Sequence, residues 1–253
     1  MRDIVKDINY FEKFIIEKND LIALNEQALL SGKVTENKVE RAKFRNFGFR
    51  LETLVAKYSK GDPIVNLKES ISEIIKHLPA EWGPTNTKVK EKVGKEIVYL
   101  DQYMLEPYER MLRILSLAYL LDVSDTDFET VVGIIDRDNI RDNLYEFIIK
   151  VRLPNRIQKK DAGYAPKSVV FKVYKNLHEA VVQSDLSKAT KYVGQFLEKD
   201  FYHKHTGFYD AHKSKVDLYY GYWSFESAAV TKIMALNDSN FRDHQYYPKD
   251  LAK

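Results

Sequence analysis

The residue types best suited to metal chemistry gather in the last quarter of the chain. Four of the six histidines lie there, near Asp200 and Asp210. Histidine and carboxylate are ordinary ligands for zinc or iron. A metal-dependent hydrolase with ligands at His203, His205 and His212 is therefore one function to weigh.

The spacing of these histidines fits a metal site poorly. His203 and His205 are two residues apart, so on a helix their side chains would point about 200° apart. The His-Glu-x-x-His pattern of zinc proteases is absent from the sequence. We therefore expect core histidines with hydrogen-bonded rings, no metal site and no cofactor.

A second group with possible chemistry is the stretch GYWSFESAAV, residues 221–230. It lacks the Gly-x-Ser-x-Gly pattern of a hydrolase nucleophile, and Ser224 has no evident base. Glu226 stands among apolar neighbours and needs hydrogen-bond donors if it is buried. Arg242 in the C-terminal tail is the expected donor, so we interpret this pair as a structural network.

The third group is an acidic segment, Asp122 to Glu146, with eight acidic and two basic residues and a net charge of −6. Acidic residues favour the first turn of a helix, which accounts for Asp125, Asp127 and Asp138 but less well for the whole set. A docking surface for a basic partner is the functional interpretation. The residues expected to bind that partner are Asp122, Asp125, Asp127, Glu129, Asp136, Asp138 and Asp142.

Helices must position these groups, because apolar residues recur every three or four positions along most of the chain. The first half predicts helices over residues 4–30, 44–58 and 67–78, and then a loop over 79–87. Residues 93–119 read as one long helix or two, with a kink or break just before Pro107. Gly32 and Gly61 are expected to end the first two helices.

The second half begins at the cap-rich stretch DVSDTD, where Ser124 or Asp125 can cap the next helix. Further helices are predicted over residues 128–135, 140–151, 166–181, 184–201 and 215–236, with a basic loop over 154–166. No segment alternates as a convincing strand. We predict an irregular all-α fold of nine or ten helices, with an N-terminal module (1–123) and a C-terminal module (124–253) packed together.

Composition excludes several classes of protein. The 253 residues include no cysteine, which rules out disulfides and thiolate sites. The net charge of +3 is too small to indicate binding to nucleic acid or membrane. Neither a signal peptide nor an apolar run of membrane-spanning length is visible. A soluble cytoplasmic protein is the expectation.

The C-terminal motifs are those of a known family. The run YYGYWSFE (219–226), followed by DSNFRDHQYYPKDL (238–251), resembles the C-terminal signature of the PoNi family. The blocks FYHKH (201–205) and FYDAHK (208–213) resemble the preceding family block. At the start, Met1-Arg-Asp and YFEKFI (10–15) resemble the matching N-terminal module. These are immunity proteins for PoNe-type DNase toxins of bacterial competition.

The resemblance implies an all-helical cytoplasmic protein that binds a cognate DNase toxin and blocks it, without catalysis and without binding DNA or membrane. A helical adaptor without a toxin partner is a further alternative. An inhibitor that mimics DNA throughout would be strongly acidic, which a charge of +3 does not support, so a local acidic patch is expected instead. The signature residues are expected to shape the fold: Tyr220, Gly221, Trp223, Glu226, Arg242, Asp243 and His244.

Overall fold

The computed structural model describes residues 1–83, 87–159 and 171–253. Within these ranges the chain forms nine α-helices and one two-stranded sheet, which confirms the predicted all-α class. The expected start of a helix at Pro166 lies outside the described residues, as does most of the basic loop before it. No helix in the described ranges combines the length and apolar character needed to cross a membrane.

The chain forms two compact units, each built from several stretches of sequence. Unit 1 comprises residues 1–87, 121–134 and 210–221, and unit 2 comprises residues 88–120, 135–209 and 222–253. The helix α5 (Asp125–Arg137) supplies its first part to unit 1 and its last turn to unit 2. The expected modules 1–123 and 124–253 stay a prediction.

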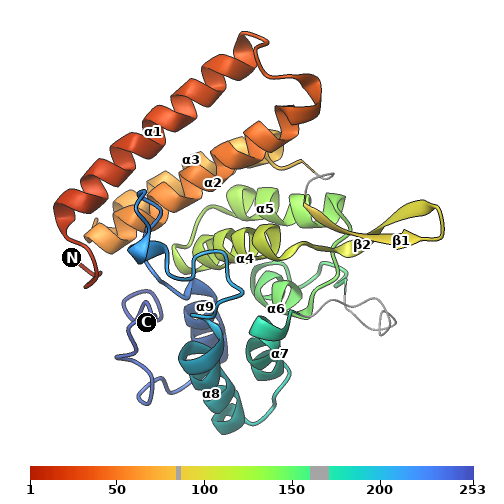
Figure 1. The fold of residues 1–253 in the computed structure, drawn as a ribbon. Coiled ribbons are helices and arrows are strands. Elements are labelled where there is room, and N and C mark those ends of the chain that lie inside the picture. The colour runs from red at the N-terminus through yellow and green to blue at the C-terminus, as the bar shows by residue number, and fades with distance from the viewer. Residues whose placement is uncertain (84–86, 160–170) are drawn as a thin grey trace. The chain divides into compact units, whose positions relative to one another are not determined.

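Unit 1 is built on three helices: α1 (Ile8–Leu30), α2 (Glu36–Lys60) and α3 (Ile64–Glu81). Helix α1 packs against α2, and α2 packs against α3 (Figure 1). Their apolar stripes form a core whose largest fully buried side chains include Phe11, Phe47 and Trp82. Removing such stripes from water is the main stabilising contribution to packed helices of this length.

The predicted ends of the first two helices are confirmed. Gly61 has φ 105° and Gly32 has φ 68°, the left-handed conformation that costs glycine least. At the other end of α1, the carboxylate of Asp7 accepts a hydrogen bond from the backbone N–H of Tyr10. The loop predicted from Pro79 onward is wrong for its first three residues, because α3 continues through Pro79 to Glu81.

The predicted final helix over residues 215–236 is wrong in its first half. Only Phe225–Met234 is helical (α9), and the residues before it follow the short turn η4 (Ala211–Lys213) in an extended path. Hydroxyls of unit 1 take the carbonyls that a helix would use. Tyr10 donates to the carbonyl of Tyr219 at 2.9 Å, and Ser59 donates to that of Tyr220 at 2.8 Å.

Unit 2 begins with a β-hairpin where a helix was predicted. Strands β1 (Lys88–Val93) and β2 (Glu96–Tyr103) pair antiparallel, so the helix expected from Val93 to Met104 is wrong. Gly94, with φ 64°, and Lys95 form a two-residue turn, which favours glycine at its first position. Helix α4 (Leu105–Leu120) follows, with Pro107 in its first turn, where proline is tolerated.

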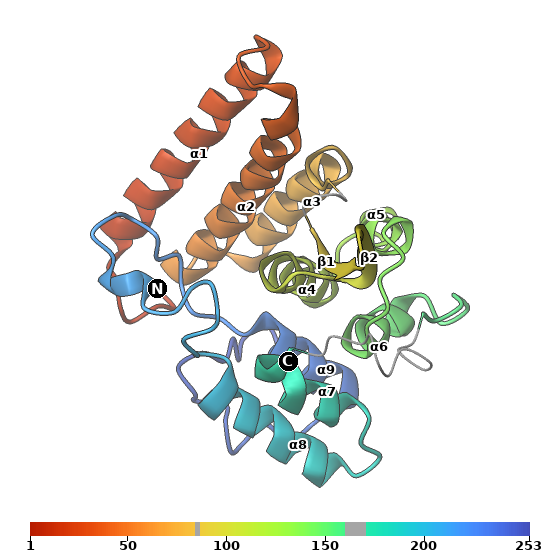
Figure 2. The same ribbon diagram turned by 45° about the vertical axis from the view of Figure 1, so that its right-hand side comes forward.

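The remaining helices of unit 2 are shorter. They are α6 (Asn143–Arg152), η2 (Lys172–Tyr174), α7 (Lys175–Val181), α8 (Leu186–Gln195), η3 (Phe196–Asp200) and α9. Helix α4 packs against α6 and α9, while α8 packs against α7 and α9 (Figure 2). Asp142 and Asp185 cap α6 and α8 by accepting backbone N–H groups. Unit 2 therefore has a helical core to which the hairpin is attached.

Candidate partner-binding surface

The acidic segment Asp122 to Glu146 does not form one continuous surface, because it is shared between the two units. Asp122, Asp125 and Glu129 are exposed in unit 1, and Asp127 is half-buried. The side chain of Ser124 accepts the backbone N–H of Asp127 at 3.1 Å and so caps α5 as predicted. These four carboxylates at a helix start form what we call the α5 acidic patch.

The α5 acidic patch is held in place by local physical chemistry. Acidic side chains in a first turn are stabilised by the positive end of the helix dipole. Lys68 of α3 lies 3.8 Å from the carboxylate of Asp122, whose side chain is 85% exposed. A pair so open to water is worth little, so the negative charge of the patch stays largely available to a partner.

Asp136 and Glu146 of unit 2 are bound to basic side chains of the same unit. Arg156 donates to Asp136 through Nε at 3.0 Å and to Glu146 through Nη1 at 2.6 Å. Burial opposes ionisation of Asp136, but the hydrogen bonds from Arg156 outweigh it and lower the pKa of the carboxyl. Lys159 adds a contact of 3.4 Å. These charges stabilise the unit.

Asp138 and Asp142 contradict the expectation of an exposed acidic segment, since they are 4% and 2% exposed. Asp138 accepts the hydroxyl of Tyr103 at 2.8 Å, and Asp142 accepts Nε2 of Gln102 at 3.0 Å. Lys88 of β1 donates to the carbonyl of Asp138 at 2.8 Å. Both aspartates therefore anchor the hairpin to the helical core of unit 2, and neither is available to a partner without unfolding this region.

The hairpin is the exposed feature that the helical interpretation missed. Ile97 is 64% exposed and Tyr99 is 44% exposed, and Lys90 lies 5.3 Å from the centre of the Tyr99 ring. The signal in the sequence was Gly94-Lys95 between runs that contain β-branched and aromatic residues. The apolar spacing of 93, 97, 100 and 104 imitated a helix.

The predicted pair of Glu226 and Arg242 is wrong. Arg242 donates to Asp238, four residues earlier, at 3.0 Å and remains 46% exposed. Glu226 is 4% exposed, and its burial raises the pKa of the carboxyl against the opposing effects of its own N–H, Arg113 and Ser224. The charge that compensates Glu226 therefore comes from α4, because the tail turn satisfies its own arginine locally.

The other signature residues also serve the fold. Gly221 has φ 115°, which a side chain would strain, and the carbonyl of Tyr220 is bound by Ser59. Trp223 is 8% exposed. Asp243 accepts Nζ of Lys249 at 2.6 Å, and burial lowers the pKa of His244, whose ring lies 5.2 Å from that of Tyr246. The role of these residues as a structural signature stays a prediction.

The histidines of the metal alternative are divided between the units. The rings of His203 and His205 lie 4.9 Å apart in unit 2, and Nδ1 of His203 accepts the backbone N–H of His205 at 3.3 Å. His212 belongs to unit 1, where its ring lies 6.2 Å from that of Tyr219. Among the described residues, the group of ligands close enough for a metal is Glu26, His77 and Glu81, which contains none of these histidines.

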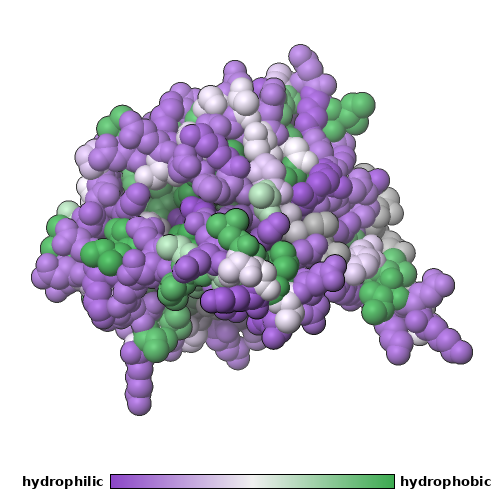
Figure 3. All heavy atoms as spheres, turned by 90° about the horizontal axis from the view of Figure 1, so that it is seen from above, coloured by the Kyte–Doolittle hydropathy of each residue, from purple (hydrophilic) through white to green (hydrophobic). Residues whose placement is uncertain are grey.

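Apolar surface does not mark a binding site on the face that Figure 3 shows. Apolar side chains there form small patches separated by hydrophilic residues. Scattered exposed apolar residues are normal for a soluble surface and need no partner. Charge is thus the better guide to a partner, and the α5 acidic patch is the part of the predicted segment that remains exposed.

Comparison with known proteins identifies the family over almost the whole chain. Residues 2–133 match the family described as PoNe immunity protein (PoNi), N-terminal. Residues 140–251 match PoNe immunity proteins (PoNi), C-terminal. No curated protein and no solved structure gives a significant match. The resemblance seen in the C-terminal and N-terminal motifs is thereby confirmed, and the chain belongs to the PoNi family of PoNe immunity proteins.

Proposed function

We propose that this protein binds a cognate PoNe-type DNase toxin in a stoichiometric complex and thereby neutralises it. The observation that carries this proposal is the match of both the N-terminal and the C-terminal PoNi families to one chain. Immunity by binding requires no catalytic site in this protein. Because the toxin attacks cellular DNA, we place the complex in the cytoplasm.

We further propose that the α5 acidic patch (Asp122, Asp125, Asp127 and Glu129) faces the toxin. A DNase must hold a polyanion, and such proteins present Lys and Arg to the phosphates. Carboxylates opposite those cations would steer the encounter and raise the association rate more than the final affinity. The corrected burial of Asp138 and Asp142 removes them from this surface.

Complex formation is tested by co-expressing the tagged protein with the product of the neighbouring toxin gene. We expect co-purification and a mass, by light scattering, that fits a fixed ratio of the two chains. Failure to bind that toxin, with both proteins folded, would overturn the proposal in favour of an adaptor function.

The proposed surface is tested separately by neutralising its four carboxylates as Asp122→Asn, Asp125→Asn, Asp127→Asn and Glu129→Gln. These substitutions keep side-chain size, and asparagine tolerates the left-handed φ of 49° at Asp122. We expect association at low salt to slow by about tenfold and its salt dependence to flatten. A control variant removes four exposed charges elsewhere, Glu12→Gln, Asp20→Asn, Glu36→Gln and Glu198→Gln. Equal slowing in both variants would show a net-charge effect and reject the surface.

A further inference from the structure

Three potential metal ligands meet between α1 and α3 of unit 1, remote in sequence from the histidines considered first. They are Glu26 of α1 and His77 and Glu81 of α3, and one ligand atom of each lies within 4.8 Å of the others. His77 and Glu81 are four residues apart on one helix, so their side chains share a face. That spacing is a common way for a helix to present two ligands to one ion.

Glu81 supplies a second and independent indication of a ligand. The residue is 6% exposed, and its Oε1 accepts Nε of Arg50 at 3.1 Å. Its other carboxylate oxygen, Oε2, is buried and has no hydrogen-bond partner in the described part of the chain. A buried carboxylate oxygen without a donor is costly. Burial accordingly raises the pKa of Glu81, although Arg50 opposes the shift.

Arg50 fixes both carboxylates without using all of their oxygens. Besides Glu81, it donates through Nη2 to Oε1 of Glu26. Hydrogen bonds of this kind orient carboxylate ligands around many metal sites. Arg50 cancels one of the two negative charges and leaves the other to be balanced by a cation.

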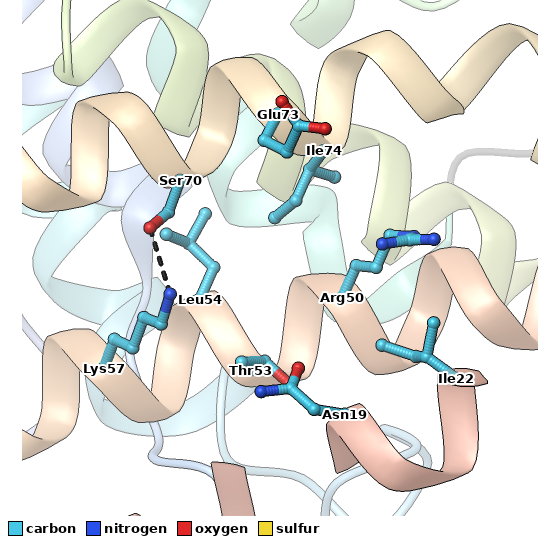
Figure 4. A pocket seen from close by; sticks show the side chains of 9 residues that line it. All are labelled: Asn19, Ile22, Arg50, Thr53, Leu54, Lys57, Ser70, Glu73 and Ile74. Atoms are coloured by element: carbon cyan, nitrogen blue, oxygen red, sulfur yellow. Dashed lines mark hydrogen bonds between the residues drawn. The ribbon is translucent and has the colours of Figure 1, made fainter. Parts of the chain in front are cut away.

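Solvent can reach the group. The side chain of Glu26 is 44% exposed and that of His77 is 39% exposed. Arg50 also lines a pocket of about 230 Å³ among α1, α2 and α3, together with Glu73 and Ile74 of α3 (Figure 4). An ion could therefore enter without separating the helices.

We propose that Glu26, His77 and Glu81 bind a divalent first-row metal ion, with Zn²⁺ preferred, and that the ion ties α1 to α3. Zinc takes imidazole nitrogen and carboxylate oxygen as ligands, and water can complete its coordination. The ion would give Glu81 the partner that the protein lacks at this position. This inference is independent of the toxin-binding proposal.

The test is calorimetric titration of ZnCl₂ into the full-length protein after treatment with EDTA. We expect one zinc site per chain, and the His77→Ala variant should bind at least about tenfold more weakly. Because the His77 side chain is partly exposed, this variant should keep its fold, which circular dichroism checks. The matched control is His203→Ala, which removes one histidine of the other cluster and should leave the affinity unchanged.

Thermal unfolding gives a second readout. Zinc should raise the Tm of the wild-type protein and of the charge control Glu69→Gln on the exposed surface of α3, and it should not raise that of His77→Ala. Absence of zinc binding, or loss of binding in His203→Ala instead of His77→Ala, would overturn the proposal. Weakening in Glu26→Gln as well would support the contribution of α1.

Discussion

The hydroxyl of Tyr103 donates a hydrogen bond of 2.8 Å to the buried carboxylate of Asp138. This contact joins the end of β2 to the connection between α5 and α6, and both residues are at most 4% exposed. Tyr103→Phe removes the donor and leaves the carboxylate oxygen unsatisfied, so we expect the free energy of unfolding to fall by about 1.5–3 kcal/mol. Urea denaturation measures it. Asp122→Asn, at an exposed site of the same acidic segment, should change it by less than about 0.5 kcal/mol.

A buried carboxyl group should make stability depend on pH in an unusual direction. Glu109 is 7% exposed, and burial raises its pKa to about 7 despite the opposing effect of Arg113. The folded state therefore favours the protonated form more than the unfolded chain does. The contribution is fully present below the ordinary pKa and is lost as the pH rises through about 7, a change of about 3 kcal/mol.

The variant Glu109→Gln isolates this effect. It cannot ionise, so its stability should fall less between pH 5 and pH 8 than that of the wild-type protein. At pH 8 the variant should be the more stable of the two. Parallel pH profiles from thermal or urea unfolding would show that Glu109 does not titrate in this range.

The corrected environment of Glu226 gives a matched comparison of two arginines. Arg113 is 8% exposed and balances the buried carboxyls of Glu109 and Glu226, so Arg113→Met should cost on the order of 3–5 kcal/mol at neutral pH. Arg242→Met should cost about 1 kcal/mol or less, because that side chain is half exposed and pairs locally with Asp238. Reversal of this order in urea denaturation would restore the pairing expected from the sequence.

Neutralisation by binding sets a limit on how little protein suffices. In a DNA-cleavage assay with a fixed amount of toxin, protection should become complete near one equivalent of this protein. Chelators applied to the immunity protein alone should not change that ratio. Protection at a small fraction of an equivalent would mean turnover and would favour the hydrolase alternative.

Local chemistry explains which parts of the fold the sequence predicted. Gly32, Gly61, Asp142 and Asp185 end or start helices as expected, because capping depends on neighbouring residues only. The hairpin was missed because four apolar residues in it happen to be spaced as on a helix. A two-residue turn at Gly94 decides the matter in favour of strands.

Partners distant in sequence could not be predicted in the same way. The approach of Arg113 to Glu226 depends on how α4 packs against α9, and the burial of Asp138 depends on the hairpin that was missed. Four neighbouring acidic residues were thus predicted correctly as a charged helix start, while two others of the same segment proved to be internal anchors. The spacing of His77 and Glu81 was visible in the sequence, but Glu26 joins them only through the pairing of three helices.

The composition of unit 1 has a consequence for synthesis on the ribosome. Its last stretch, residues 210–221, supplies the hydroxyl that binds Asp3 and the carbonyls that bind Tyr10 and Ser59. Those three residues emerge more than 150 residues earlier than their partners, so unit 1 has to wait for most of the chain before it is complete. Folding is therefore largely post-translational, and a nascent chain stalled before residue 210 would carry an unfinished first unit.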